Sequence, residues 1–188
     1  MISIRRARTA DAVAIGAVHV ATWRSAYAGI LPDRFLARMS VPRQAAHYDA
    51  AIRSSTAVFV AAASGTDVPP GSGSRIVGFA TAGRARGGEF ARRLAEGEVE
   101  TLYVLDDWRE RGVGRKLMRA AAAHLAEIGC RSCFLWVLRD NPSRWFYQRL
   151  GGKPGAEALI QFAGTRLPQT AFVWDPIERL LAASAQAS

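Results

Sequence analysis

The segment from Leu102 to Met118 carries the residues whose types and spacing best suit the binding of an anion. Gly112 and Gly114 open a predicted helix that follows a predicted strand and a short turn, and glycines at this point let a ligand approach the backbone closely. The free N–H groups and the dipole at a helix N-terminus both attract negative charge. Five cations surround the turn, with only Glu110 opposing them: Arg109, Arg111, Arg115, Lys116 and Arg119. This arrangement suits a pyrophosphate.

The same segment departs from two familiar nucleotide-binding patterns. It lacks the Lys-Ser/Thr ending of a Walker P-loop, and it is not Gly-x-Gly-x-x-Gly. The alternative is a glycine-bearing turn beside a solvated basic helix face. The preceding strand and the five cations favour the anion site over that alternative.

The elements that must position this turn follow from hydrophobic periodicity and turn residues. We expect strands at 2–5, 57–61, 76–80, 98–104, 132–138, 158–162 and 166–174. We expect helices at 9–27, 32–39, 42–52, 112–128 and 142–150, and a short one from 176 onwards. Residues 64–75 are expected to form a long hairpin loop, and 84–97 a second mobile segment. Helices between strands, with a hairpin on either side of them, favour a mixed α/β sheet.

Length, composition and charge narrow the class of protein. A chain of 188 residues with 49% hydrophobic residues fits one domain, 1–188, with about 176–188 as a C-terminal tail. The net charge of +9 favours an anionic partner. The longest apolar run, 57–63, is far shorter than the ~20 residues of a membrane helix, so no membrane partner is expected. The first residues contain no signal-peptide core, and we expect a cytoplasmic protein.

The cysteines and histidines do not predict a metal or redox site. Cys130 and Cys133 form a lone C-x-x-C that follows a helix and precedes a strand, the reverse of the usual redox arrangement. The three histidines, His19, His47 and His124, are scattered. We therefore expect no metal and two partly buried thiols.

Three blocks of sequence together resemble one family. Arg109, Gly112 and Gly114, after a strand ending Leu-Tyr-Val, resemble the Gln/Arg-x-x-Gly-x-Gly/Ala acyl-CoA signature of the GNAT superfamily of N-acetyltransferases. The stretch 141–152 resembles its Asn…Phe-Tyr…Leu-Gly block, and the segment 23–32 is similar to the Trp-x-x-x-Tyr…Leu-Pro of many small bacterial members. The Asn-to-Tyr spacing is six residues here, whereas many members have seven.

The resemblance implies a fold and an activity. The fold is a mixed, mostly antiparallel central sheet of about seven strands, flanked by helices in three layers. The activity is direct transfer of an acetyl group from acetyl-CoA to a primary amine of a small molecule or peptide, without a covalent enzyme intermediate. Homodimers are common in the family, so a homodimer is also consistent with the resemblance.

The resemblance also implies how the cosubstrate is held. The backbone of Leu102, Tyr103 and Val104 would pair with the pantetheine arm as an added strand, next to a bulge that frees N–H groups for the thioester carbonyl. Asn141 would hydrogen-bond that arm. The pyrophosphate would lie on the signature segment, whose residues are Arg109, Glu110, Arg111, Gly112, Val113, Gly114 and Arg115.

An alkyl amine is protonated at neutral pH and must lose a proton before it attacks, so a general base or a relayed water is needed. Glu98 and Glu100 share one face of a strand, and we favour Glu100. The alternative is that both only face solvent. Tyr147 would protonate the leaving thiolate, or else be a buried core residue. Trp23 and Tyr27 either line the acceptor pocket or pack the first helix on the sheet.

Two other functions compete with this hypothesis. A basic nucleic-acid-binding domain would account for the net charge, but no standard DNA or RNA module is present and the densest basic cluster lies in the signature. A non-catalytic acyl-CoA sensor would carry the same signature. We expect the first two helices and the segments 64–75 and 85–97 to shape the acceptor pocket.

Overall fold

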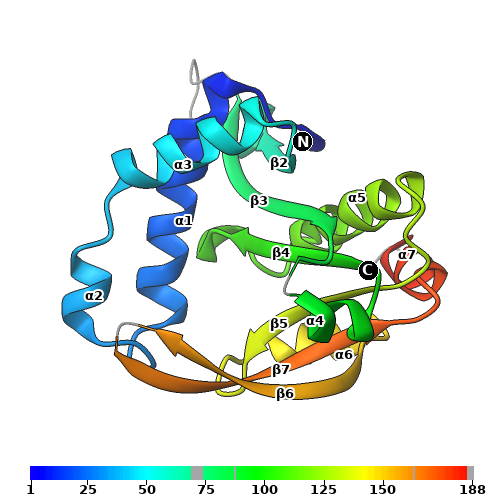
Figure 1. Cartoon of the computed structure of the whole chain (residues 1–188). Coiled ribbons are helices and arrows are strands. Elements are labelled where there is room, and N and C mark those ends of the chain that lie inside the picture. The colour runs from blue at the N-terminus through cyan, green and yellow to red at the C-terminus, as the bar shows by residue number, and fades with distance from the viewer. Residues whose placement is uncertain (69–73, 87, 163, 186–188) are drawn as a thin grey trace.

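A seven-stranded sheet forms the centre of the protein (Figure 1). The computed structural model describes residues 1–68, 74–86, 88–162 and 164–185. The strands are β1 (Ile2–Arg6), β2 (Ala57–Ala63), β3 (Arg75–Arg84), β4 (Gly97–Val104), β5 (Cys133–Leu138), β6 (Lys153–Phe162) and β7 (Thr165–Trp174). The helices are α1 (Ala12–Ala26), α2 (Asp33–Ala37), α3 (Val41–Arg53), α4 (Gly88–Leu94), α5 (Val113–Glu127), α6 (Arg144–Arg149) and α7 (Glu178–Ala185).

The sheet is mixed and mostly antiparallel. Its strand order is β1-β2-β3-β4-β5-β7-β6, and every neighbouring pair is antiparallel except β4 and β5. The parallel pair is connected by α5, because parallel neighbours need a crossover that a tight turn cannot provide. The expected fold class is confirmed.

Helices cover both faces of the sheet. On one face, Ile15 and Val18 of α1 and Tyr48 of α3 pack with Val60 and Phe79 of β2 and β3. On the other face α5 buries a continuous apolar stripe, which belongs to two clusters beneath β2 to β5. These layers place the N-terminus of α5 at the end of the central strand β4.

The segment 84–97 is not simply a mobile loop, and that expectation was wrong for its centre. Residues 88–94 form α4, and Ala91 and Ala95 are buried against Phe134 and Ala171. Glycine and arginine dominate the composition of this segment and concealed its small apolar face. Part of the other expected loop, 69–73, lies outside the described residues.

The C-terminal part of the chain is more ordered than its composition indicated. The expected short helix after Pro176 is α7, and Leu180 within it is fully buried in the α5 cluster rather than trailing as a tail. Strand β6 begins at Lys153, five residues before its expected start. Pro154 and Gly155 look like turn residues, but an irregularity in the pairing with β7 accommodates them at this edge strand.

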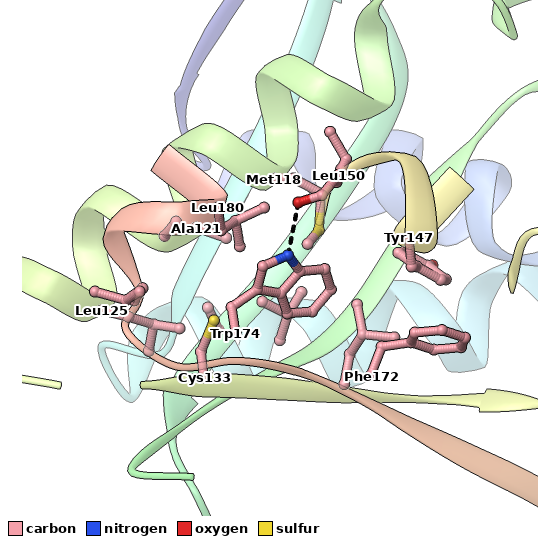
Figure 2. Packing of buried hydrophobic residues seen from close by; sticks show 14 of the residues in the cluster. Met118, Ala121, Leu125, Cys133, Tyr147, Leu150, Phe172, Trp174 and Leu180 are labelled. Carbon is pink, nitrogen blue, oxygen red and sulfur yellow. Dashed lines mark hydrogen bonds between the residues drawn. The ribbon is translucent and has the colours of Figure 1, made fainter. Parts of the chain in front are cut away.

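Trp174 joins the end of the sheet to the helices behind it (Figure 2). The indole is completely buried among Met118 and Leu125 of α5, Leu180 of α7 and Tyr147 of α6. Its Nε1–H donates a hydrogen bond of 2.8 Å to the carbonyl oxygen of Leu150, just after α6. This bond fixes the end of α6, the helix that carries Tyr147.

We expect Trp174→Phe to lower the free energy of unfolding by about 2–4 kcal/mol. The smaller ring leaves a cavity, and the buried Leu150 carbonyl loses its donor. Urea denaturation of the variant and the parent measures the difference. Leu159→Ala, at a largely exposed side chain of β6, is the control and should change stability little. Equal effects of the two substitutions would contradict this account.

Candidate active site

The central feature of the site is a gap between the two parallel strands. Within the described residues, β4 and β5 pair only at Gly97 with Cys133 and at Glu98 with Phe134. Beyond these pairs the β5-facing backbone groups of β4 have no ladder partner in that part of the structure. A cavity of about 470 Å³ lies here and is lined by residues 99–104 of β4 and 135–137 of β5.

The cavity brings most of the sequence-predicted site residues together. Those that line it are Tyr27, Glu100, Leu102, Tyr103, Val104, Arg109, Glu110, Gly112, Val113, Gly114, Arg115, Asn141 and Tyr147. Three others do not line it, namely Trp23, Glu98 and Arg111. The roles assigned to all of these residues from the sequence remain predictions.

The N-terminus of α5 forms one end of the cavity. Gly112 adopts a left-handed conformation at φ +73°, and Glu110 does so at φ +60°. The first hydrogen bond of the helix runs from the Lys116 N–H to the Gly112 carbonyl oxygen, so the N–H groups of the preceding turn have no acceptor within the helix. Gly114 leaves room for Phe146, whose ring would lie 3.2 Å from an added Cβ. This end of the cavity can therefore donate several hydrogen bonds to an anion.

The five cations around this turn are more dispersed than the sequence suggested. Only Arg109 and Arg115 line the cavity. Arg109 also pairs with Asp106 at 2.7 Å. Arg111 lies over the Trp108 ring, 4.9 Å from its centroid, and Arg119 donates to the Leu181 carbonyl of α7 at 2.9 Å.

Lys116, the fifth cation, lines a separate groove between α5 and β1. The anion end of the cavity therefore combines backbone N–H groups with two guanidinium groups. It does not collect all five charges.

Asn141 lies on the loop between β5 and α6, where it both stabilises the local turn and lines the cavity. Its side-chain Oδ1 accepts the Ser143 backbone N–H at 2.9 Å, which stabilises the turn into α6. The residue is buried and lines the cavity. Because Oδ1 is occupied by the turn, the amide nitrogen is the group that remains for a ligand or for Tyr27.

Tyr27 and Tyr147 are two of the tyrosines that line the cavity. Burial raises the pKa of Tyr147, and the proximity of Tyr27 adds to that effect. Burial also raises the pKa of Tyr27, and a hydrogen bond with the Asn141 side chain partly offsets the rise. Tyr147 is therefore a protonated hydroxyl at neutral pH, able to donate a proton or a hydrogen bond.

Glu100 lies at a bulge in β4. Thr81 of β3 pairs with Thr101, the next pair is Ala82 with Val99, and Glu100 between them is the extra residue. Its carboxylate accepts a hydrogen bond of 3.5 Å from the Thr81 hydroxyl and lines the cavity. The bulge therefore directs a carboxylate to the point where the two strands separate.

Glu98 lies on the same face as Glu100 but outside the cavity lining. Its side chain is half-buried. Burial raises the pKa of Glu98, the negative charge of Glu100 raises it further, and the Arg86 backbone N–H opposes the rise. Of the two carboxylates, Glu100 is therefore the one that a molecule in the cavity would contact.

Trp23 packs the first helix instead of lining the cavity. Its ring is 5.1 Å from His19, 6.3 Å from Tyr103 and 5.2 Å from Phe162. His19 donates or accepts a 2.8 Å hydrogen bond with the Tyr48 hydroxyl, and burial lowers the pKa of His19 to about 4. This aromatic cluster holds α1, and with it Tyr27, against β4 and the β6–β7 hairpin.

Sequence reasoning missed about half of the cavity wall. The additional lining residues are Thr22, Ala26, Val99, Thr101, Leu135, Trp136, Val137, Ser143, Phe146, Arg149, Leu150 and Ala183. The β5 residues could have been found, because a strand facing the expected gap must line it. No signal in the sequence distinguished Thr22. Its buried hydroxyl has no hydrogen-bond partner within the described residues, so it is a polar group available to a ligand.

The two cysteines, Cys130 and Cys133, lie outside the cavity lining. Cys130 and Cys133 are free, buried thiols, and burial raises the pKa of Cys133 to about 12, which disfavours the thiolate. Over the described residues, no group of three or more His, Cys, Asp or Glu side chains could hold a metal ion. Within the same residues, no helix is long and apolar enough to cross a membrane.

Comparisons with known proteins agree with this geometry. Residues 23–152 match the model of the acetyltransferase (GNAT) family. The chain is 31% identical over 180 residues to the N-acetyltransferase YuaI of Bacillus subtilis, a match that covers 96% of each chain.

Two solved structures share the fold. YncA from Salmonella typhimurium, solved with acetyl-CoA, has a TM-score of 0.66 and 22% identity over 93% of this chain and 94% of its own. The PaiA N-acetyltransferase from Thermoplasma acidophilum, solved with coenzyme A, has a TM-score of 0.59 and 16% identity over 90% of this chain and 98% of its own.

The left-handed backbone at Gly112 gives a test of the turn at the start of α5. An added Cβ would meet no atom within 4 Å, so the cost of Gly112→Ala is conformational. We expect it to lower the free energy of unfolding by about 1–2 kcal/mol. Gly112→Asn should cost less, because asparagine tolerates this conformation better. Urea denaturation of both variants measures the costs, and an equal loss in both would contradict the explanation.

Proposed function

The chain belongs to the acetyltransferase (GNAT) family and is an N-acetyltransferase, and on that premise we propose that it transfers an acetyl group directly from acetyl-CoA to a primary amine. One observation carries the proposal. The gap between β4 and β5 and the N-terminus of α5 share one cavity with Glu100 and Tyr147. An extended arm, an anion and two proton-transfer groups can therefore be accommodated together.

The cavity fits acetyl-CoA in its chemistry. The unpaired edge of β4 suits the amide-bearing pantetheine arm, because an extended chain can add to it as a strand. The N–H groups in the first turn of α5, together with Arg109 and Arg115, suit the pyrophosphate. When bound, acetyl-CoA supplies an activated acetyl thioester. N–H groups of β4 freed by the bulge at Glu100 would stabilise the negative charge that develops on the thioester oxygen.

Glu100 and Tyr147 would move the two protons of the reaction. Glu100, directly or through a water, takes a proton from the ammonium so that the nitrogen lone pair can attack the thioester carbon. A carbon–nitrogen bond forms, the nitrogen releases its second proton to water, the carbon–sulfur bond breaks, and the sulfur leaves as a thiolate. Tyr147, whose pKa burial keeps above its usual range, is protonated at neutral pH, donates its proton to that thiolate and is then reprotonated from water.

Acetyl-CoA binding and turnover test the proposal, with Tyr147→Phe as the informative variant. Acetyl-CoA at ~100 times its dissociation constant should stabilise the protein by roughly 2.7 kcal/mol in thermal unfolding. Thiol release with a panel of amines should reveal turnover. Tyr147→Phe should lower kcat by about 10²-fold or more while the acetyl-CoA Kd stays within about twofold.

Tyr48→Phe is the matched control, because Tyr48 is a buried tyrosine outside the cavity lining. It should leave kcat close to that of the parent. No response to acetyl-CoA would refute the proposal, and binding without turnover of any amine would favour a non-catalytic acyl-CoA sensor. An unchanged kcat in Tyr147→Phe would remove Tyr147 as the acid.

The role of Glu100 predicts a particular pH dependence. Glu100→Gln should lower kcat/KM most near neutral pH, where the amine is protonated. The deficit should shrink as the pH approaches ~10, where the amine loses its proton unaided. Profiles of kcat/KM from pH 6.5 to 9.5 for the parent, Glu100→Gln and Glu98→Gln measure this. A constant deficit across the range, or a larger deficit in Glu98→Gln, would show that Glu100 is not the base.

A further inference from the structure

Helix α4 lies on the same face of the sheet as α1 and α3, but over different strands. Phe134 and Trp136 of β5 pack against α4, whereas Phe79 and Tyr103 pack against α1. Glu98 pairs with Phe134 in the parallel ladder, and neighbours in a ladder point to the same face. The two carboxylates of β4 and the aromatic residues of β5 therefore lie on the same face of the sheet, with α1 and α3 on one side and α4 on the other.

Glu100 of β4 and Trp136 of β5 line the cavity from the two sides of the gap. Each lies two residues beyond the last ladder pair, Glu98 with Phe134, and both line the cavity. The strands separate at this level, so the gap is open on this face between a carboxylate and an indole. A molecule that enters from this face reaches the cavity between these two side chains.

Phe90 of α4 supports the indole and leaves an aromatic surface open to solvent. The Phe90 and Trp136 rings are stacked, with centroids 6.3 Å apart and an interplanar angle of 16°. Phe90 is 52% exposed and Trp136 is half-buried. Phe134 meets the edge of Trp136 at 6.1 Å and fixes it from the other side. The exposed half of this stack provides a flat aromatic surface next to Trp136, which lines the cavity.

Resting on the proposed acetyl transfer, we propose that the acceptor is an arylalkylamine: a single ammonium group joined by a short alkyl chain to an aromatic ring. The ammonium lies by Glu100, where Glu98 adds a second negative charge to the same face. The ring lies on the Trp136–Phe90 stack, since aromatic pairs gain attraction beyond the burial of their area. The Trp136–Phe90 stack favours this acceptor over an aliphatic amine of equal charge. The carboxylates of Glu98 and Glu100 attract both amines and therefore do not set the preference.

Three amines separate these contributions in the intact enzyme with acetyl-CoA: 2-phenylethylamine, n-butylamine and spermidine. We expect kcat/KM, measured by thiol release, to be about tenfold or more higher for 2-phenylethylamine than for n-butylamine. Phe90→Ala should reduce this ratio at least threefold, and Trp136→Leu should abolish it. Val13→Ala, which truncates an exposed apolar side chain of α1 outside the cavity, is the control and should leave the ratio unchanged.

Binding is measured alongside turnover, so that a damaged cavity is recognised. The Kd of acetyl-CoA should be the same in Phe90→Ala as in the parent. Equal kcat/KM for the two monoamines, a preference for spermidine, or a ratio that Phe90→Ala leaves unchanged would overturn the arylalkylamine assignment and leave the acetyl transfer intact. Absence of turnover with all three amines, with acetyl-CoA bound, would overturn the assignment together with the proposed function.

Discussion

The cavity depends on one interrupted interaction, the parallel pairing of β4 and β5. Two residue pairs join these strands, and the pairing then stops. Had it continued, the edge of β4 would be occupied by β5 and the cavity between them would not exist. Both strands stay paired on their other sides, β4 with β3 through the bulge at Glu100 and β5 with β7 without a register shift. The sheet therefore opens in its middle without losing its continuity at either edge.

The interruption persists because other elements hold the two halves apart. The bulge at Glu100 changes the direction of β4 where the strands part. The aromatic cluster around Trp23 anchors α1 on the β4 side, and Trp174 anchors the end of α6 behind the β5 side. Tyr27 and Tyr147, which these two anchors position, meet along the same cavity. A half-buried indole at Trp23 and a buried one at Trp174 thus support a polar, partly open centre.

Much of this organisation follows from local sequence, and the remainder depends on contacts that are distant in the chain. The α5 turn was predictable because glycine, a preceding strand and clustered arginines occur within about fifteen residues. The alternation of β4 placed Glu98 and Glu100 on one face, but the bulge that brings only Glu100 to the cavity depends on pairing with β3. Helix α4 was missed because the apolar residues it buries are small alanines. Their burial depends on Phe134 and Ala171, which are far away in the sequence. Lys116 and Arg119 were misplaced because a helix with 3.6 residues per turn directs them away from its entrance.

The connection that contains α4 joins β3 to β4, and it begins and ends at two residues that pair with each other. Arg84 pairs with Gly97, and the Ala85 N–H bonds to the Glu96 carbonyl oxygen. The excursion between them is thus a closed loop attached to a hairpin stem, on the opposite side of the sheet from α5. Its length and sequence can drift without shifting the register of either strand. Sequence divergence is therefore easiest in this connection between β3 and β4. Replacing residues 85–96 with those of a relative would exchange the aromatic surface that Phe90 provides, while the strands of the sheet stay in place.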